Sequence, residues 1–353
     1  MNIPELYTEN IADSEQYRAL YVESIGHAVE RIKSKAQEKR AAWISPEKLR
    51  DNPDFYHEEY VKMLGIHNLI DAMGNGAPRI EETPHAEDAL CTISRMKIYL
   101  AEDVVFTGIF FKPKGAKEPL RLVVCSHGGG GSPELCADMI GPNNYSHMVR
   151  RCLEGGAAVF APQLMLWSLS PAKCGGRIPQ YSTPYNRDKS NRDFRLCGTG
   201  IISFEIYAIS RTATALMLRP DIKSDAYRMT GLSYGGFYTL YTMAYDRRIE
   251  CGYSVAYFND KFIYNWHDMI FDGSGARFTD VEVAALCAPR RLFIEIGRTD
   301  PVFDGNEGEK LFPLTEAYFA AQNALENVRF NCHPGGHVHD PEGSGMRFLL
   351  ENL

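Results

Sequence analysis

The sequence predicts an α/β fold, in which a mostly parallel central sheet is covered by helices on both faces. From Cys91 onward, short apolar runs alternate with longer stretches of helical spacing, which is the pattern of strands joined by crossover helices. Two of these runs, residues 120–125 and 157–161, are apolar almost throughout, as expected for strands buried on both faces. A third observation is a glycine-flanked serine in residues 231–236, between a strand and a helix of this pattern.

The composition is that of an ordinary globular protein, because 44% of the 353 residues are hydrophobic and 24% are charged. The formal net charge of -7 disfavours a general nucleic-acid binder, and no apolar stretch reaches membrane-spanning length. The 9 cysteines lack C-x-x-C spacing, and residues 1–10 lack a basic and apolar leader. We therefore expect a cytoplasmic protein with reduced thiols that binds neither nucleic acid nor membrane.

The first part of the chain, residues 1–90, is expected to be a helical extension packed on the main domain. Residues 14–40 have the spacing of a long amphipathic helix, with Ser14 as its N-cap. Shorter helices are expected to start at Ser45 and to cover residues 54–64. Packing or homo-oligomerisation is favoured as the role of these helices over a cover for an active site. The apolar stripe of the long helix consists of Tyr17, Leu20, Tyr21, Ile25, Ala28, Val29 and Ile32.

The main domain is expected to span residues 91–353. It begins with an antiparallel hairpin of strands 93–100 and 104–111, because the two runs are joined by a short polar turn. Two irregular segments, 165–200 and 259–279, are inserted after strands, at the sheet edge where such folds bind ligands. The remaining elements are strands 120–125, 157–161, 226–230, 252–256, 292–296 and 328–332, and helices 143–153, 201–218, 234–245, 311–324 and one from 345.

The motif Gly231-Leu232-Ser233-Tyr234-Gly235-Gly236 predicts a nucleophile on a sharp turn from strand to helix. Such a turn brings its backbone close to the neighbouring strands, so the positions two residues from the serine must be small. A serine hydroxyl also needs a base, an orienting acid and donors for the developing oxyanion. The rest of the chain offers a residue for each role.

An acid and a base follow the motif in the order Ser, Asp, His. Asp300 comes after strand 292–296, and His337 lies in a glycine-rich loop after strand 328–332. Asp304 is the rival acid, but it lies farther from the strand end. His333 and His339 are the rival bases, and we prefer His337 because it follows two glycines. A metal site of these histidines with Asp340 is disfavoured, since no second ligand group has recognisable spacing.

A glycine run after strand 120–125 predicts the oxyanion donors. His127 is followed by four glycines, whose bare backbone N–H groups can approach a substrate carbonyl. The proposed donors are the N–H groups of Gly129 and Tyr234, with Gly130 as the near alternative to Gly129. His127 itself is interpreted as shaping the loop rather than acting as a base.

These motifs, taken in order, resemble the α/β-hydrolase superfamily, and more narrowly its dienelactone-hydrolase and acetyl-xylan-esterase-like branch, over residues 91–353. The resemblance implies that Ser233 attacks an ester carbonyl, His337 accepts its proton and Asp300 orients the imidazole. An acyl-enzyme then forms and is hydrolysed, with no metal or organic cofactor. The substrate class would be a small or carbohydrate-linked ester.

Two other functions stay open. The serine motif is also similar to that of prolyl-oligopeptidase-like serine peptidases, although about ninety N-terminal residues cannot supply a propeller domain. A non-catalytic binding protein on the same fold is the third hypothesis. The inserted segments should set specificity through an anion-binding basic loop or an aromatic wall, or they form a charge-balanced solvated loop and core packing. The basic residues are Arg177, Arg187, Lys189, Arg192 and Arg195, and the aromatic ones are Trp167, Tyr181, Tyr185, Trp266 and Phe271.

Overall fold

A computed structural model describes residues 7–141, 143–166, 186–263 and 266–353. In these residues nine strands form one sheet in the order β1-β2-β3-β5-β4-β6-β7-β8-β9. The first strands pair antiparallel, and all pairs from β5–β4 to β8–β9 are parallel, so the predicted fold class is confirmed. The strands are β1 (Arg79–Glu87), β2 (Cys91–Tyr99), β3 (Val105–Pro113), β4 (Leu120–Ser126), β5 (Ala158–Pro162), β6 (Ile222–Leu232), β7 (Ile249–Val255), β8 (Arg291–Gly297) and β9 (Val328–His333).

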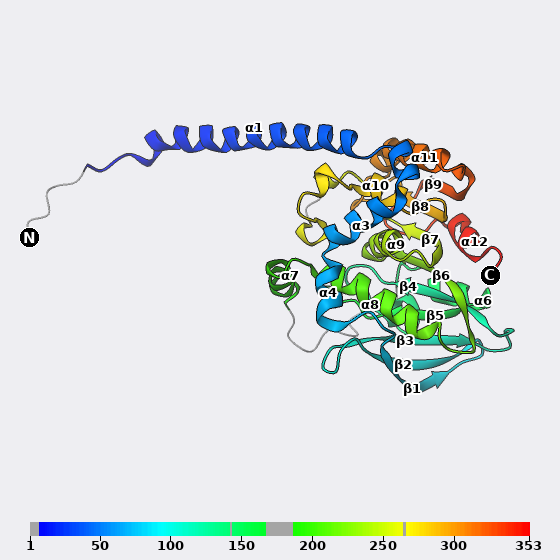
Figure 1. Cartoon of the computed structure of the whole chain (residues 1–353). Coiled ribbons are helices and arrows are strands. Elements are labelled where there is room, and N and C mark those ends of the chain that lie inside the picture. Colours follow the sequence, from blue (N-terminus) through cyan, green and yellow to red (C-terminus); the bar gives the residue numbers. More distant parts are fainter. Residues whose placement is uncertain (1–6, 142, 167–185, 264–265) are drawn as a thin grey trace, which may run out of the picture.

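The apolar runs occupy the centre of the sheet. Val124 of β4 pairs with Phe160 of β5 on one side and with Met229 of β6 on the other, and all three are fully buried. Helices lie on both faces, and each face has its own apolar cluster (Figure 1). The larger cluster includes residues of α3 (Pro53–Leu64), α8 (Ile201–Leu216), α9 (Tyr234–Tyr245) and α11 (Gly305–Ala321), and the smaller includes residues of α5 (Pro133–Cys136), α6 (Met148–Glu154) and α12 (Ser344–Leu350).

The N-terminal helices divide into a packed and an exposed part. Helices α2 (Pro46–Asp51), α3 and α4 (Ile66–Met73) contribute core residues such as Leu49, Tyr60 and Ile66. Helix α1 (Ile11–Trp43) has no buried residue and leads away from the body (Figure 1). It begins before the predicted Ser14, because the side chain of Asn10 accepts the Ala12 N–H and caps the helix.

Two expectations about local structure were wrong. Residues 79–87, expected within the helical extension, form edge strand β1, whose side chains are largely exposed and include Pro84. An edge strand of this kind needs main-chain pairing only and leaves no apolar alternation in the sequence. The segment 165–200, expected to be irregular, contains α7 (Arg187–Leu196). The described residues of the segment 259–279 include the short turns η1 (Lys261–Ile263), η2 (His267–Met269) and η3 (Ser274–Ala276), which are compatible with an irregular segment, and α10 (Asp280–Ala285) follows it.

Two further expectations concern the cysteines and the membrane. The eight cysteines within the described residues are all free, and seven of them are at least partly buried. Within the same residues no helix has both the length and the hydropathy needed to cross a bilayer.

Candidate active site

Ser233 lies on a strained turn between β6 and α9. Its backbone has φ 63° and ψ −120°, a conformation that residues with a side chain rarely adopt. The turn is held at both ends, because the Ser233 N–H donates to the Val255 carbonyl at 2.8 Å and the Phe237 N–H donates to the Ser233 carbonyl at 2.9 Å. The sheet and the helix therefore fix the serine at the carboxyl end of β6.

The neighbouring glycines are needed because other backbone atoms pack against them. A Cβ added to Gly235 would lie 2.0 Å from the carbonyl oxygen of Ser126, and one added to Gly236 would lie 2.4 Å from that of Val255. Both distances are far below van der Waals contact with backbone that cannot move aside. The predicted reason for glycine beside the serine, close backbone approach, is therefore present in the structure.

Asp300 and His337 are joined by a hydrogen bond. His337 Nδ1 lies 2.8 Å from Asp300 Oδ2, and the Asp300 side chain is fully buried. The other carboxylate oxygen accepts the N–H groups of Val302 at 2.7 Å and Phe303 at 3.1 Å. Asp300 is thus oriented by the turn after β8, and its bond to Nδ1 leaves Nε2 as the free nitrogen of the imidazole.

Ser233 lies at the same edge of the sheet as this pair. Among the described residues no hydrogen bond joins the Ser233 hydroxyl to His337, and such bonds are often absent from unliganded sites. A row of aromatic rings connects the two regions: Tyr234 contacts Trp266 at 5.9 Å between ring centroids, Trp266 contacts Phe303 at 5.3 Å, and Phe303 contacts the His337 ring at 6.1 Å. The structure therefore brings Asp300 and His337 into direct contact, and the row of rings links this pair to the residue that follows Ser233.

The rival acid, Asp304, has a different task. It is the N-cap of α11, where its carboxylate accepts the Asn306 N–H at 2.9 Å, and this backbone hydrogen bond lowers the pKa of Asp304. No group of three His, Cys, Asp or Glu side chains in the described residues is arranged to hold a metal ion. The capping role of Asp304 favours Asp300 as the acid.

The rival bases are also engaged elsewhere. His333 uses both ring nitrogens inside its own loop, because Nδ1 accepts the Gly335 N–H and Nε2 lies 3.1 Å from the Val338 carbonyl oxygen. His339 is buried beside the Tyr253 hydroxyl, and burial lowers its pKa to about 3. Neither ring is available to a substrate, which favours His337 as the base.

The glycine loop after β4 lies against Ser233. The Gly128 N–H donates to the Tyr145 hydroxyl at 2.9 Å, and the Gly131 N–H donates to the Gly128 carbonyl at 3.0 Å. A Cβ on Gly128 would lie 3.6 Å from Ser233 Oγ, so the next N–H along the chain, that of Gly129, lies near the serine. No acceptor for this N–H is found among the described residues, which agrees with its predicted role as an oxyanion donor.

His127 shapes this loop as a neutral, buried side chain. Its Nδ1 lies 2.9 Å from the Gly128 carbonyl oxygen, and its Nε2 accepts the Leu164 N–H at 3.0 Å. Burial lowers its pKa to about 4. Since both nitrogens are occupied, the ring positions the loop and is not free to act as a base.

This burial predicts a loss of stability in weak acid. The unfolded chain takes up a proton at His127 below its ordinary pKa near 6.5, whereas the folded chain resists protonation down to about pH 4. The free energy of unfolding should therefore fall by about 2 kcal/mol from this group alone between about pH 6.5 and about pH 4.5. Urea unfolding of the wild type and of His127→Gln across this range measures the difference; parallel pH curves for the two proteins would contradict the prediction.

A buried network beside the serine was not foreseen from the sequence. The Tyr234 hydroxyl donates to Asp268 at 2.8 Å, and Arg187 Nε donates to the other oxygen of Asp268 at 2.9 Å. Arg187 also donates to the carbonyl of Met165 and is ion-paired with Glu205. Its guanidinium therefore ties the two described ends of the 165–200 segment to the residue that follows the nucleophile.

The other basic residues of this segment are also neutralised by carboxylates. Lys189 and Arg192 both pair with Asp193, and Arg195 pairs with Asp272. Arg177 lies outside the described residues. The described basic side chains thus agree with a charge-balanced loop rather than with an anion-binding one.

The aromatic residues divide in a similar way. Trp266 lies in the row of rings at the site, whereas Phe271 is buried and stacks on Tyr241 in the core. Trp167, Tyr181 and Tyr185 lie outside the described residues.

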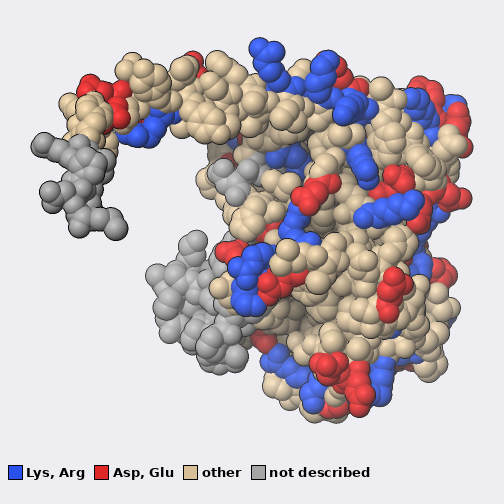
Figure 2. Space-filling model, turned by 60° about the vertical axis from the view of Figure 1, so that its left-hand side comes forward, with Lys and Arg blue, Asp and Glu red and all other residues tan. Residues whose placement is uncertain are grey.

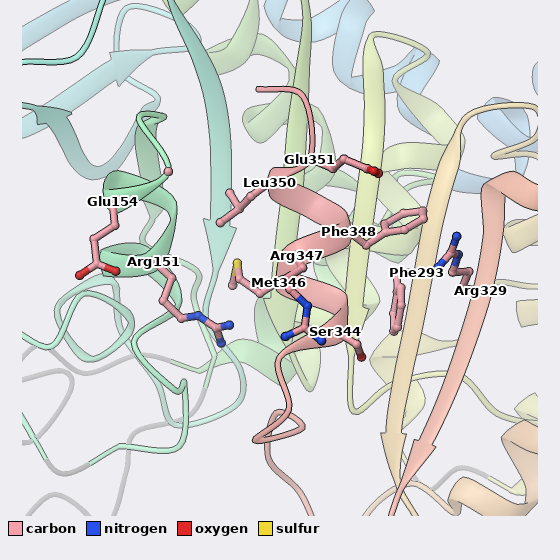
Figure 3. A pocket seen from close by; sticks show the side chains of 11 residues that line it. Arg151, Glu154, Phe293, Arg329, Ser344, Met346, Arg347, Phe348, Leu350 and Glu351 are labelled. Atoms are coloured by element: carbon pink, nitrogen blue, oxygen red, sulfur yellow. The ribbon is translucent and has the colours of Figure 1, made fainter.

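A hollow of about 740 Å³ lies elsewhere, between the end of α6, the strands β8 and β9, and α12 (Figure 3). Arg151, Arg329, Arg347 and Phe348 are among its lining residues. None of Ser233, Asp300 and His337 lines it, so this hollow is not the substrate site formed by the predicted residues.

We next compared the sequence and the structure with those of known proteins. No family model and no curated protein matches the sequence. Solved structures do match, among them a methylesterase with a TM-score of 0.64 at 16% identity, covering 89% of this chain and 67% of that one. The chain has the α/β-hydrolase fold. The structure is also similar to acetyl xylan esterase 1 from Thermoanaerobacterium sp., with a TM-score of 0.56 at 16% identity over 84% of this chain and 93% of that one. It is similar to a glucuronoyl esterase from Solibacter usitatus as well, with a TM-score of 0.57 at 14% identity over 82% of this chain and 90% of that one.

Within the α/β-hydrolase fold, the functional residues lie on loops beyond the carboxyl ends of the strands. Ser233, Asp300 and His337 follow β6, β8 and β9, which are parallel strands of one sheet. At these identities the similarity establishes the fold, and the roles of the three residues rest on their own geometry.

Proposed function

We propose that the protein is a serine hydrolase that cleaves carboxylic esters through Ser233, His337 and Asp300. The observation that supports this most strongly is the hydrogen bond of 2.8 Å between His337 and a fully buried Asp300, at the sheet edge that carries Ser233 on a strained turn. A histidine held in this way by a buried carboxylate keeps Nε2 unprotonated and directed outward.

The proposed mechanism has two acyl-transfer steps. His337 Nε2 accepts the proton of the Ser233 hydroxyl as Oγ attacks the ester carbonyl, and Asp300 stabilises the imidazolium that forms. The oxyanion of the tetrahedral intermediate is bound by the N–H groups of Gly129 and Tyr234. Collapse of the intermediate breaks the bond to the alcohol oxygen, which takes the proton from His337. Water then attacks the acyl-enzyme by the same route and releases the acid and free Ser233.

The proposed substrates are small or carbohydrate-linked esters. The structural neighbours bear the names of acetyl xylan, methyl and glucuronoyl esterases, which supports an ester as the substrate. Trp266, whose ring centroid lies 5.9 Å from that of Tyr234, is the described aromatic residue that we expect to contact the sugar.

An ester panel tests this proposal. The wild type is assayed with p-nitrophenyl esters of increasing acyl length, acetylated sugars and uronate methyl esters, alongside prolyl p-nitroanilide. We expect hydrolysis of short-chain esters, almost none of the anilide, and covalent labelling of Ser233 by a fluorophosphonate probe. Turnover of the anilide above the esters would instead indicate a peptidase, and failure of the probe to label Ser233 would indicate a protein without this catalytic serine.

A further inference from the structure

Helix α1 carries an apolar stripe that its own chain leaves uncovered. Five large side chains recur at intervals of three or four residues, which places them on one side of the helix. They are between 47% and 69% exposed, although each is aromatic or β-branched. These residues, the α1 stripe, are Tyr17, Tyr21, Ile25, Val29 and Ile32.

The α1 stripe lies next to the side of α1 that binds the body. Towards its C-terminal end the helix is held by Arg40, which donates to the Gly275 carbonyl at 2.7 Å and pairs with Glu282 at 3.2 Å. Two helical turns before Arg40, the Lys33 ammonium lies 5.1 Å from the centre of the Phe262 ring. The body ends there, and the rest of the helix stands clear of it (Figures 1 and 2). The α1 stripe thus lies beside the body-binding side of the helix and extends into solvent.

A solvated position for this part of α1 is physically unfavourable. The helix has 33 residues and is about 50 Å long, and its outer part gains no stability from tertiary packing. Exposed apolar surface of this extent on a rigid element is characteristic of an interaction site. We therefore expect the α1 stripe to bind an apolar surface of similar length.

The charges on α1 identify that occupant. Its outer half is acidic, with Asp13, Glu15 and Glu23 against the single base Arg18, whereas the half nearer the body is basic. Figure 2 shows blue side chains gathered where the helix joins the body. The segregation extends beyond the first and last turns, so compensation of the helix dipole does not account for all of it. The basic half has Arg31, Lys33, Lys35, Lys39 and Arg40 against Glu30 and Glu38.

We propose that two copies of the chain dimerise by packing their α1 stripes together in antiparallel orientation, about a two-fold axis near Ile25. This arrangement lays the acidic half of each helix along the basic half of the other, and a two-fold contact satisfies both copies with the same surface. A parallel pair would instead place like charges together. In the antiparallel pair the outer half of the partner helix also runs towards Phe262 and Ile263, which are 39% and 54% exposed.

The position of this interface gives it a connection with the candidate active site. Phe262 and Ile263 belong to the 259–279 segment, which also carries Trp266 beside Tyr234. Dimerisation would therefore cover the outer side of the segment whose inner side faces the nucleophile.

The oligomeric state tests the proposal directly. Sedimentation of the full chain should give twice the mass of one chain, and the double variant Tyr21→Glu/Ile25→Glu should sediment as a monomer at concentrations at least roughly tenfold above the wild-type dissociation constant. His27→Glu is the matched control, since His27 lies on the opposite side of α1 and should leave the dimer intact. A monomeric wild type, or a double variant that remains dimeric, would overturn the proposal.

A charge-reversal pair tests the antiparallel orientation. In the variant D13K/E15K both halves of the helix have a net positive charge, and in K35E/K39E both halves have a net negative charge. Each variant alone should dimerise at least tenfold more weakly than the wild type, and an equimolar mixture should recover a dimer that contains one chain of each. Wild-type affinity of each variant alone would exclude the antiparallel arrangement. Thermal unfolding of each variant shows whether the body remains folded, because residues 13–35 contribute no buried side chain.

Discussion

Ser233→Ala is expected to lower kcat for p-nitrophenyl acetate by roughly 10⁴- to 10⁶-fold. The variant removes the only atom that forms the acyl bond in the proposed mechanism. Background hydrolysis would remain, because the N–H groups of Gly129 and Tyr234 and the binding surface would stay in place. Steady-state kinetics, with fluorophosphonate labelling before and after the substitution, measure both the rate and the loss of the nucleophile.

The control for this variant is another buried serine. Ser203 lies in α8, and its hydroxyl has no hydrogen-bond partner within the described residues. Ser203→Ala should therefore keep full activity, and both variants should unfold near the wild-type temperature. Full activity of a folded Ser233→Ala protein would exclude the proposed nucleophile, whatever the identity of the physiological ester.

The sequence predicted the parallel core well because burial on both faces leaves continuous apolar runs. The runs at residues 120–125 and 157–161 were recognised in this way, and they form β4 and β5. The order of the site residues was equally accessible, since each follows a strand and is accompanied by glycine or proline. The hydrogen bond between His337 and Asp300, however, depends on the register of β8 and β9. No local sequence pattern encodes this register.

Other parts of the site could not be predicted because their signals are not local. Tyr145 holds the glycine loop through its hydroxyl, yet in the sequence it is one aromatic residue in a polar stretch. Arg187 was grouped with its basic neighbours, although it is buried and pairs with Asp268 and Glu205. A buried ion pair between segments far apart in the chain becomes visible only when the fold brings them together.

The exposed part of α1 shows a different limit. Its periodicity predicted an amphipathic helix, and the helix is present, but the same pattern was expected to pack on the main domain. Periodicity indicates that a face needs a partner without indicating whether the partner belongs to the same chain. The charge segregation along α1 carries that second piece of information.

Asp300→Asn should lower kcat for the same ester by about 10⁴-fold while leaving the fold intact. The asparagine oxygen can still accept the N–H groups of Val302 and Phe303, so the turn after β8 keeps its hydrogen bonds. Its amide nitrogen, however, would donate to His337 Nδ1 and move the ring proton to Nε2, so that Nε2 could no longer accept the proton of Ser233. Asp304→Asn is the matched control: asparagine caps a helix about as well as aspartate, so this variant should keep both its stability and its kcat. If the two variants lost activity equally, or if Asp304→Asn lost more, the assignment of the acid would be wrong. If Asp300→Asn lost activity only through unfolding, the bond of 2.8 Å would be structural rather than catalytic.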